Sequence, residues 1–310
     1  MRRCFTTSVR YLGHENPLGL PRNSAAPNIP RAQRGLPSKR RIPNVSKIVA
    51  VSSAKGGVGK STLAANLALA FSRHNLRTGI LDTDIFGPSI PTLFGLPHAE
   101  SPELSDSNLL MPLQSYGVRS MSMGYLLPAE SAPVAWRGLM VMKALQQLLY
   151  EVDWSPGLDV LVLDLPPGTG DIQLSIGQQV EVDGAVIVST PQDVALKDAI
   201  KGVNMFGKMG VKVLGMVQNM SVFVCPKCGE STKIFPPSTS PGGKEGVEVA
   251  CRDIGIDFLG DVPLDPAICS DADRGKPTIV AEEASGERIL STYFEEIAAK
   301  IATKVNLEWK

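Results

Sequence analysis

One short stretch of the chain has the residue types and the spacing of a phosphate-binding loop. Residues 50–62 read AVSSAKGGVGKST, so three glycines stand just before a lysine and a serine. Glycine adopts backbone dihedrals that are closed to other residues, which lets backbone N–H groups approach phosphate oxygens. Lys60 can then pair with a phosphate, and the Ser61 hydroxyl can ligate Mg²⁺. The predicted nucleotide-binding residues of this loop are Gly56, Gly57, Val58, Gly59, Lys60, Ser61 and Thr62.

The loop differs from the usual pattern, G-x-x-x-x-G-K-[ST], at its first position and carries an additional lysine. Ala54 stands where the pattern has its first glycine, while the eight residues from Lys55 to Thr62 fit. The additional lysine is Lys55, directly before the glycines. The contacts of this second lysine decide whether the domain works alone or as half of a dimer.

Carboxylates follow two apolar runs further along the chain. The run in RTGILDTDIFGPSIP ends in Asp82 and Asp84, and the run in LDVLVLDLPPGTGD ends in Asp164. We expect Asp164 to be the partner of a magnesium ion that Ser61 holds. For Asp82 a simpler role stays open, that of a helix cap or a turn carboxylate.

Two glycines and one asparagine complete the predicted nucleotide site. Gly168 and Gly170 follow Asp164 and make the next loop pliable enough to sense a γ-phosphate. Asn219 ends the apolar run VKVLGMVQNM, and open α/β sheets bind their ligands at the carboxyl ends of their strands. Its amide can pair with the edge of a purine base.

A second chemical motif is the cysteine pair Cys225 and Cys228, in the order C-P-x-C-G. Two thiolates can hold one metal ion or one edge of a cluster, but zinc sites and [4Fe–4S] clusters need four ligands. Three interpretations stay open: an intrachain zinc site completed by Cys251 and Cys269, a redox dithiol, or a two-fold dimer that brings two pairs together. The fifth cysteine, Cys4, lies near the N-terminus.

The elements that must position these residues are alternating strands and helices. Apolar runs predict buried parallel strands over residues 48–51 and within the stretches RTGILDTDIFGPSIP, LDVLVLDLPPGTGD, GAVIVSTPQD and VKVLGMVQNM. Helical spacing predicts a helix from near Lys60 and crossover helices within 136–152 and 193–209. We therefore expect one α/β domain over residues 46–305, a doubly wound, mostly parallel sheet, followed by a short tail, 306–310.

The N-terminal segment differs from the rest in charge. Residues 1–47 hold ten of the 31 Lys/Arg residues and one of the 31 acidic residues, so this segment carries +9 and the remainder −9. An acidic body argues against a nucleic-acid partner, and no apolar run reaches the ~20 residues of a membrane helix. Arg-rich, acid-poor leaders fit mitochondrial import, so residues 1–45 are expected to be a targeting leader and disordered linker. A disordered basic tail is the alternative.

The loop KGGVGKST resembles the deviant Walker A motif of the MinD/ParA/Mrp group of P-loop ATPases. In that group the additional lysine, here Lys55, reaches across a homodimer to the other subunit's nucleotide, much like an arginine finger. The resemblance implies catalytic roles for Lys55 and Lys60. It further implies that Asp84 positions the attacking water, that Asp164 is the Walker B acid, and that Asn219 reads adenine.

The chain is similar, from Ser46 onward, to the Mrp/ApbC family of iron–sulfur carriers. The motifs that carry this resemblance are LDTDIFGPSIP, VLDLPPGTGD, STPQDVAL, QNMSVFVCPKC and FLGDVPLD. WRGLMVM and the basic leader are most similar to its mitochondrial members, which serve assembly of respiratory complex I. Cytosolic scaffold relatives carry four N-terminal cysteines, of which this chain has only Cys4.

The resemblance implies a weak ATPase that uses ATP and Mg²⁺ and carries a [4Fe–4S] cluster on the axis of a homodimer. Cys225 and Cys228 of each subunit would hold that cluster in the reducing mitochondrial matrix. The implied partners are apo iron–sulfur acceptors, among them complex I subunits. No integral membrane segment is expected, and peripheral contact with the inner membrane is allowed.

Two other functions stay open at this stage. A positioning ATPase would need a membrane-binding helix, and the C-terminal stretch does place Ile289, Phe294, Ile297 and Ile301 on one side. A core-packed helix explains that pattern too, because basic residues do not dominate its polar face. A binding module with structural zinc would use the loop only to sense nucleotide.

Overall fold

The computed structural model describes residues 39–97, 101–126, 138–225, 227–235 and 246–309. All of them belong to one unit of the chain, residues 37–310. The predicted leader and linker therefore lie outside the described residues, except for residues 39–45.

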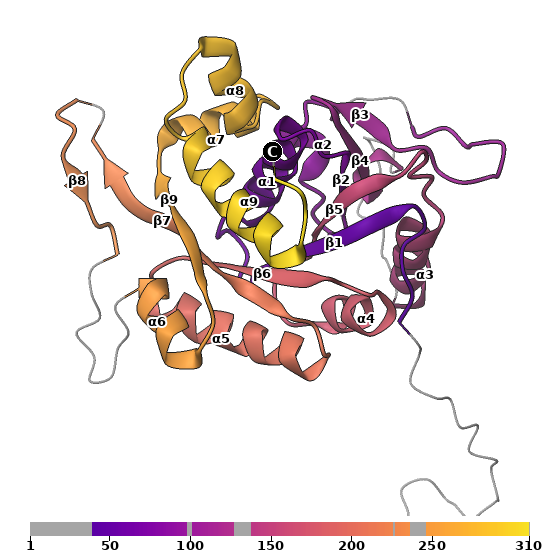
Figure 1. Cartoon of the computed structure of the whole chain (residues 1–310), viewed down its shortest axis with the longest axis horizontal. Coiled ribbons are helices and arrows are strands. Elements are labelled where there is room, and N and C mark those ends of the chain that lie inside the picture. The colour runs from indigo at the N-terminus through magenta and orange to yellow at the C-terminus, as the bar shows by residue number, and fades with distance from the viewer. Residues whose placement is uncertain (1–38, 98–100, 127–137, 226, 236–245, 310) are drawn as a thin grey trace, which may run out of the picture. The chain divides into compact units, whose positions relative to one another are not determined.

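The centre of this unit is a mostly parallel sheet, which has nine strands within the described residues (Figure 1). The strand order is β3-β4-β2-β5-β1-β6-β7-β8, and β9 pairs with β7. Only β3 and β8 pair antiparallel to their neighbours among these strands. The strands are β1 (Val45–Ser52), β2 (Thr78–Asp82), β3 (Leu113–Ser115), β4 (Val118–Ser122), β5 (Leu158–Asp164), β6 (Gly184–Ser189), β7 (Val213–Val224), β8 (Ser231–Thr232) and β9 (Phe258–Leu264).

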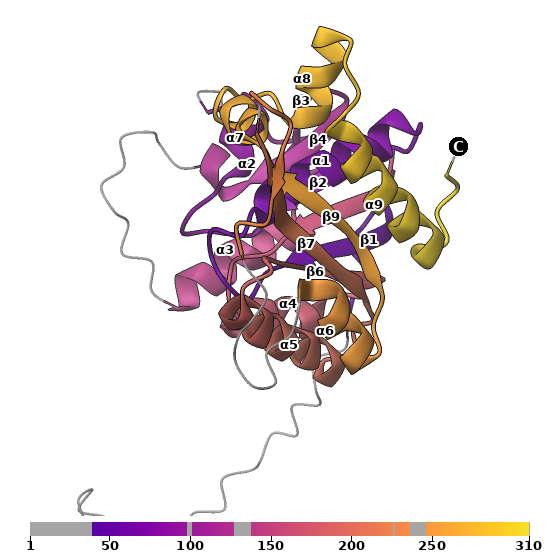
Figure 2. The ribbon, with the colours of Figure 1, turned by 90° about the vertical axis from the view of Figure 1, so that its left-hand side faces the viewer.

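Helices cover both faces of the sheet, as Figure 2 shows from the side. One face carries α1, α2, α7, α8 and α9, and the other carries α3, α4, α5 and α6. The helices are α1 (Lys60–Arg73), α2 (Ile90–Leu93), α3 (Gly138–Tyr150), α4 (Asp171–Gln179), α5 (Asp193–Lys208), α6 (Gly246–Ile254), α7 (Pro266–Asp273), α8 (Thr278–Ser285) and α9 (Ser291–Val305), with a 3₁₀ turn at Met123–Tyr125. The expected doubly wound α/β fold is confirmed.

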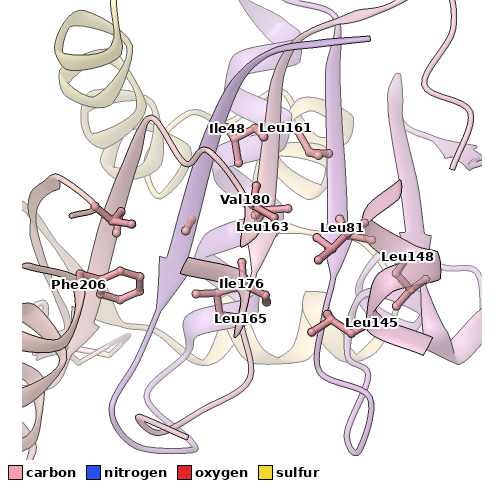
Figure 3. Close-up of a cluster of buried hydrophobic side chains, with 14 of the residues drawn as sticks. Ile48, Leu81, Leu145, Leu148, Leu161, Leu163, Leu165, Ile176, Val180 and Phe206 are labelled. Atoms are coloured by element: carbon pink, nitrogen blue, oxygen red, sulfur yellow. The ribbon is translucent and has the colours of Figure 1, made fainter. Parts of the chain in front are cut away.

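The central strands are apolar on both sides because both faces of the sheet are covered. Along β1, Ile48 and Ala50 enter the core beneath α3–α6, whereas Val49 and Val51 enter the core beneath α1 and α9. This alternation follows from the two-residue period of a strand. Figure 3 shows the first of these cores, where Phe206 of α5 and other helix residues pack on the sheet.

The predicted start of the domain at residue 46 is too late. The Arg40 N–H donates to the Gln179 carbonyl at 2.7 Å, and the Glu181 N–H donates back to the Arg40 carbonyl at 3.0 Å. The Ile42 side chain is 1% exposed in the core. Residues 39–45 therefore belong to the folded unit, because backbone pairing and one buried side chain hold them against it.

The predicted C-terminal tail also packs onto the domain. Leu307 and Trp309 lie against the core beneath α1 and α9, and the Trp309 ring stacks on His74 with ring centroids 3.7 Å apart. In α9 the side chains of Phe294, Ile297 and Ile301 are buried, which matches the core-packed alternative. Ile289 precedes that helix and is exposed. None of the described helices is both long and apolar enough to cross a membrane.

Candidate functional site

The phosphate-binding loop lies between β1 and α1, as the sequence predicts. Gly57 and Gly59 have φ of 77° and 81°, the left-handed region that glycine enters without strain. The Gly59 carbonyl accepts the Leu63 N–H at 3.0 Å and so begins α1. A Cβ on Gly59 would also lie 2.1 Å from Nδ2 of Asn219, so this position requires glycine for two reasons.

Lys60 is buried and forms an ion pair with Oδ1 of Asp164 at the end of β5. Its Nζ also donates to Oγ of Ser61 at 3.0 Å. Oδ2 of Asp164 is buried and has no partner among the described residues. Burial raises the pKa of Asp164, and the neighbouring Lys60 opposes that rise. A buried carboxylate oxygen without a partner, beside a serine hydroxyl, fits a magnesium ion bound directly or through water.

Asp82 and Asp84 have different surroundings although they are two residues apart. Asp82 is fully buried, and its register partner on the next strand is Asp164. Burial, followed by the charge of Asp164, raises the pKa of Asp82 to about 7. Four groups donate hydrogen bonds to Asp82 at 3.0–3.2 Å, namely the N–H groups of Asp84, Ser89 and Ile90 and the Ser122 hydroxyl. Asp82 is therefore a turn and cap carboxylate, the role that the sequence left open for it.

Asp84 is half-buried and faces the cavity described below. Its Oδ1 accepts the N–H groups of Phe86 and Gly87 at 3.3 and 3.2 Å, which fixes the carboxylate at the cavity wall. A carboxylate held in this way can accept a hydrogen bond from a water molecule beside a phosphate.

A cavity of about 630 Å³ opens beside the loop. Of the predicted residues, Gly56, Gly57, Gly59, Lys60, Ser61, Thr62, Asp84 and Asn219 line it. Its far wall follows β9 and includes Pro263, Leu264, Ile268 and Cys269, which we did not predict from the sequence. That wall could not be found locally, because it is about 200 residues from the loop in sequence and β9 reaches the cavity through its pairing with β7.

Besides Gly170, four residues of the predicted nucleotide site do not line the cavity. Val58 is buried, and its carbonyl accepts Nδ2 of Asn219 at 2.8 Å. Asp164 lies behind Lys60, with which it is paired. Lys55 is half-buried. The pKa of Asp198 on α5 is lowered mainly by its hydrogen bond with Lys201 and, to a smaller extent, by the positive charge of Lys55.

The fourth is Gly168, with φ of 99°, whose N–H donates to the Ser53 carbonyl at 2.8 Å. The loop after β5 is thereby joined to the phosphate-binding loop. Gln173 of α4 also contacts this loop, and the sequence analysis missed it. The sequence does contain a signal for this contact, because Gln173 stands three residues after Gly170, which is the spacing of a capping box.

The cysteine pair lies at the tip of the β7–β8 hairpin. The Cys225 N–H donates to the Glu230 carbonyl at 2.9 Å, and the Gly229 N–H donates to the Cys225 carbonyl at 2.8 Å. N–H groups of Cys228 and Lys227 point at the Cys225 sulfur and lower the pKa of its thiol. The turn thus favours a thiolate, the form that binds metal.

The other described cysteines do not join this pair. Cys251 is buried in α6, where burial raises its pKa to about 11, and Cys269 is exposed on α7. No group of three or more His, Cys, Asp or Glu side chains within the described residues could hold a metal ion. The intrachain zinc site with Cys251 and Cys269 is therefore not formed in this structure.

One strand, β7, connects the cavity to the cysteine pair. Asn219 and Met220 line the cavity, and Cys225 follows six residues after Asn219. Between them the register against β9 shifts, and Met220 adopts φ of 57°. The Ser221 hydroxyl donates to Oδ2 of Asp261 at 2.6 Å, which anchors the strand beyond the shift.

Comparison with known proteins places these features in context. A sequence model described as "ParA: NUBPL iron-transfer P-loop NTPase" matches residues 44–302. The "Iron-sulfur cluster transfer protein NUBPL" of Mus musculus is 51% identical over 256 residues, 82% of this chain and 77% of that protein. The Arabidopsis thaliana "Iron-sulfur protein required for NADH dehydrogenase, mitochondrial" is 44% identical over 268 residues, 86% of this chain and 81% of that protein.

A solved structure is similar as well. The nucleotide-binding protein of Archaeoglobus fulgidus in complex with ADP has a TM-score of 0.63 and 36% sequence identity, and the match covers 75% of this chain and 87% of that one.

Proposed function

The chain belongs to the NUBPL-type iron-transfer P-loop NTPase family, and from that premise we propose that it is an ATP-binding carrier of [4Fe–4S] clusters. It would deliver this cluster to apoproteins. The single observation that carries the proposal is the Cys225–Cys228 turn at the end of β7, the strand that also lines the nucleotide cavity.

The nucleotide half of the proposal rests on the Lys60–Asp164 pair. With ATP bound, Lys60 would pair with a phosphate oxygen in place of the Asp164 carboxylate, and Ser61 and Asp164 would hold Mg²⁺. The ion would neutralise charge on the phosphates. Asn219 and Asp84 line the cavity; in this proposal the Asn219 amide would meet the base, and Asp84 would orient a water molecule at the terminal phosphate. A weak ATPase activity follows from this arrangement.

The cluster half requires a second copy of the chain. Two thiolates per chain supply half of the ligands that a [4Fe–4S] cluster needs, and a two-fold axis supplies the rest. The apolar side chains of Phe86, Val194 and Val224 are 66%, 60% and 41% exposed; the first two follow the carboxyl ends of β2 and β6, and Val224 is the last residue of β7. They therefore lie along the same edge of the sheet as the phosphate-binding loop. This edge, with Lys55 outside the cavity of its own chain, suits an interface with a second copy.

We also propose that the protein acts in the mitochondrial matrix and serves assembly of respiratory complex I. The name of the Arabidopsis thaliana relative supports this, since that protein is mitochondrial and required for NADH dehydrogenase. The Arg-rich leader supports import. The acceptors would then be apo subunits of complex I.

Anaerobic reconstitution with iron and sulfide tests the proposal. The wild-type protein should bind about four iron and four sulfide per two chains and should be dimeric when loaded. Cys225→Ser should lose the cluster and keep ATP binding, whereas Cys269→Ser, at an exposed cysteine outside the hairpin, should keep the cluster. One zinc per chain without a cluster, or a loaded monomer, would reject the proposal.

A further inference from the structure

The loop between β5 and α4, residues 165–170, is held by one buried side chain. Nε2 of Gln173 donates to the Pro166 carbonyl at 2.6 Å and to the Gly168 carbonyl at 2.7 Å. Oε1 of Gln173 accepts the Gly170 N–H at 2.6 Å. The Gln173 side chain is 1% exposed, and its bond to the Pro166 carbonyl is fully buried, away from competing water.

The same loop lies against the nucleotide cavity. Pro167 lines that cavity, and the Gly168 N–H donates to the Ser53 carbonyl directly before the phosphate-binding loop. The loop begins at Leu165, next to the buried Asp164. A side chain that fixes Pro166 and Gly168 thus fixes the backbone around Pro167 at the cavity wall.

Helix capping alone does not explain this arrangement. Gln173 is at the third position of α4, where a Gln or Glu side chain commonly accepts the N–H of the N-cap residue, here Gly170. That role uses only Oε1, and a glutamate would fill it as well. The two bonds that Nε2 donates go to loop carbonyls, and a carboxylate cannot donate them.

We propose that Gln173 is a positioning residue for ATP hydrolysis: it holds the 165–170 loop in the geometry that the terminal phosphate requires. This inference rests on the proposed nucleotide function. ADP lacks the terminal phosphate, so its binding depends on residues 56–62 and Asn219 and does not need the clamped loop. The hydrogen bonds of Gln173 to the 165–170 loop should therefore affect the rate of ATP hydrolysis rather than the affinity for nucleotide.

Three variants of the full-length chain separate this role from capping. Gln173→Glu keeps the capping acceptor and loses the donors, Gln173→Met loses both at similar length, and Gln178→Glu places the same charge at an exposed glutamine of α4. The measurements are single-turnover ATP hydrolysis with Mg²⁺, the KM for ATP, and the Kd of a fluorescent ADP. Both changes at Gln173 should lower the hydrolysis rate about tenfold to a hundredfold and leave KM and the ADP Kd within about twofold, while Gln178→Glu should match wild type.

Each result has a defined reading. If Gln173→Glu hydrolyses ATP at the wild-type rate, the residue is only a cap and the inference is wrong. A rise in ADP Kd equal to the loss of rate would also overturn it, because the effect would then be on the site as a whole. If Gln173→Met does not fold, Gln173→Glu still decides, since it keeps the cap. A wild-type protein that binds neither ATP nor ADP would instead refute the proposed nucleotide function.

Discussion

The buried pair Asp82 and Asp164 predicts that the nucleotide-free protein loses stability as the pH rises. Burial and the charge of Asp164 raise the pKa of Asp82 from 3.8 to about 7, and burial raises the pKa of Asp164 as well. A carboxyl whose pKa is raised by folding stabilises the fold most in its protonated form. Its contribution is fully present below about pH 4 and is lost as the pH rises through about 7.

The size of this effect follows from the shift. Each unit of pKa difference corresponds to about 1.4 kcal/mol, so the whole shift of Asp82 is worth about 4 kcal/mol. Part of this stabilisation is already lost at pH 5, because Asp82 in the unfolded chain is mostly ionised at that pH. Between about pH 5 and about pH 8.5, linkage predicts a fall of about 3 kcal/mol in the free energy of unfolding from this one group. The raised pKa values of Tyr125 and Cys251, about 12 and about 11, lie above this window.

Urea unfolding across this pH range, without nucleotide, measures the fall. Asp164→Asn is the matched variant, because it removes the negative charge beside Asp82 and leaves Lys60 to favour the ionised form of Asp82. The free energy of unfolding of this variant should therefore fall less steeply with pH than that of the wild type. Mg²⁺ with ADP should restore more stability at pH 8.5 than at pH 5, because the ion favours the ionised carboxylates. Equal pH slopes for wild type and Asp164→Asn would refute the reasoning.

The other predictions concern single residues. Gly59→Ala should weaken ADP binding at least ~tenfold in a titration, because its left-handed φ and the contact with Asn219 both exclude a Cβ, whereas Gly207→Ala, with open space around it, should bind normally. Met220→Val should lower the free energy of unfolding by about 1–2 kcal/mol in urea, because a β-branched residue resists φ of 57°, and an equal loss in Met220→Asn would contradict this. Glu282→Ala should lower the free energy of unfolding by about 2 kcal/mol, because Glu282 accepts three N–H groups at the start of α9. Glu283→Ala, at the exposed neighbouring position, should lower it by less than half as much.

Much of the site was predictable because its signals are local. The glycines, Lys60 and Ser61 are consecutive, and Asp164 directly follows an apolar strand, so position along the chain was enough. The Cys225–Cys228 pair was predictable for the same reason, and its ligand number led to the dimer, which stays a prediction.

Other features required the fold. Asp82 and Asp84 look alike in the sequence, and only the pairing of β2 with β5 buries the first against Asp164 and leaves the second at the cavity. The binding of Lys60 to Asp164, 104 residues away, is likewise set by the parallel register of β1 and β5.

By itself, the sequence determined the chemistry of each segment: a phosphate loop, strand-end carboxylates, a thiolate turn and the apolar periods that make an α/β sheet. The tertiary structure alone decided which of these meet. In the folded chain β9 lines the cavity, Gln173 donates a hydrogen bond to the loop after β5, and residues 39–45 pair with the domain. The physical reason is that side-chain chemistry and hydrophobic period are local, whereas contacts across a parallel sheet depend on register and crossover, which no short stretch of sequence specifies.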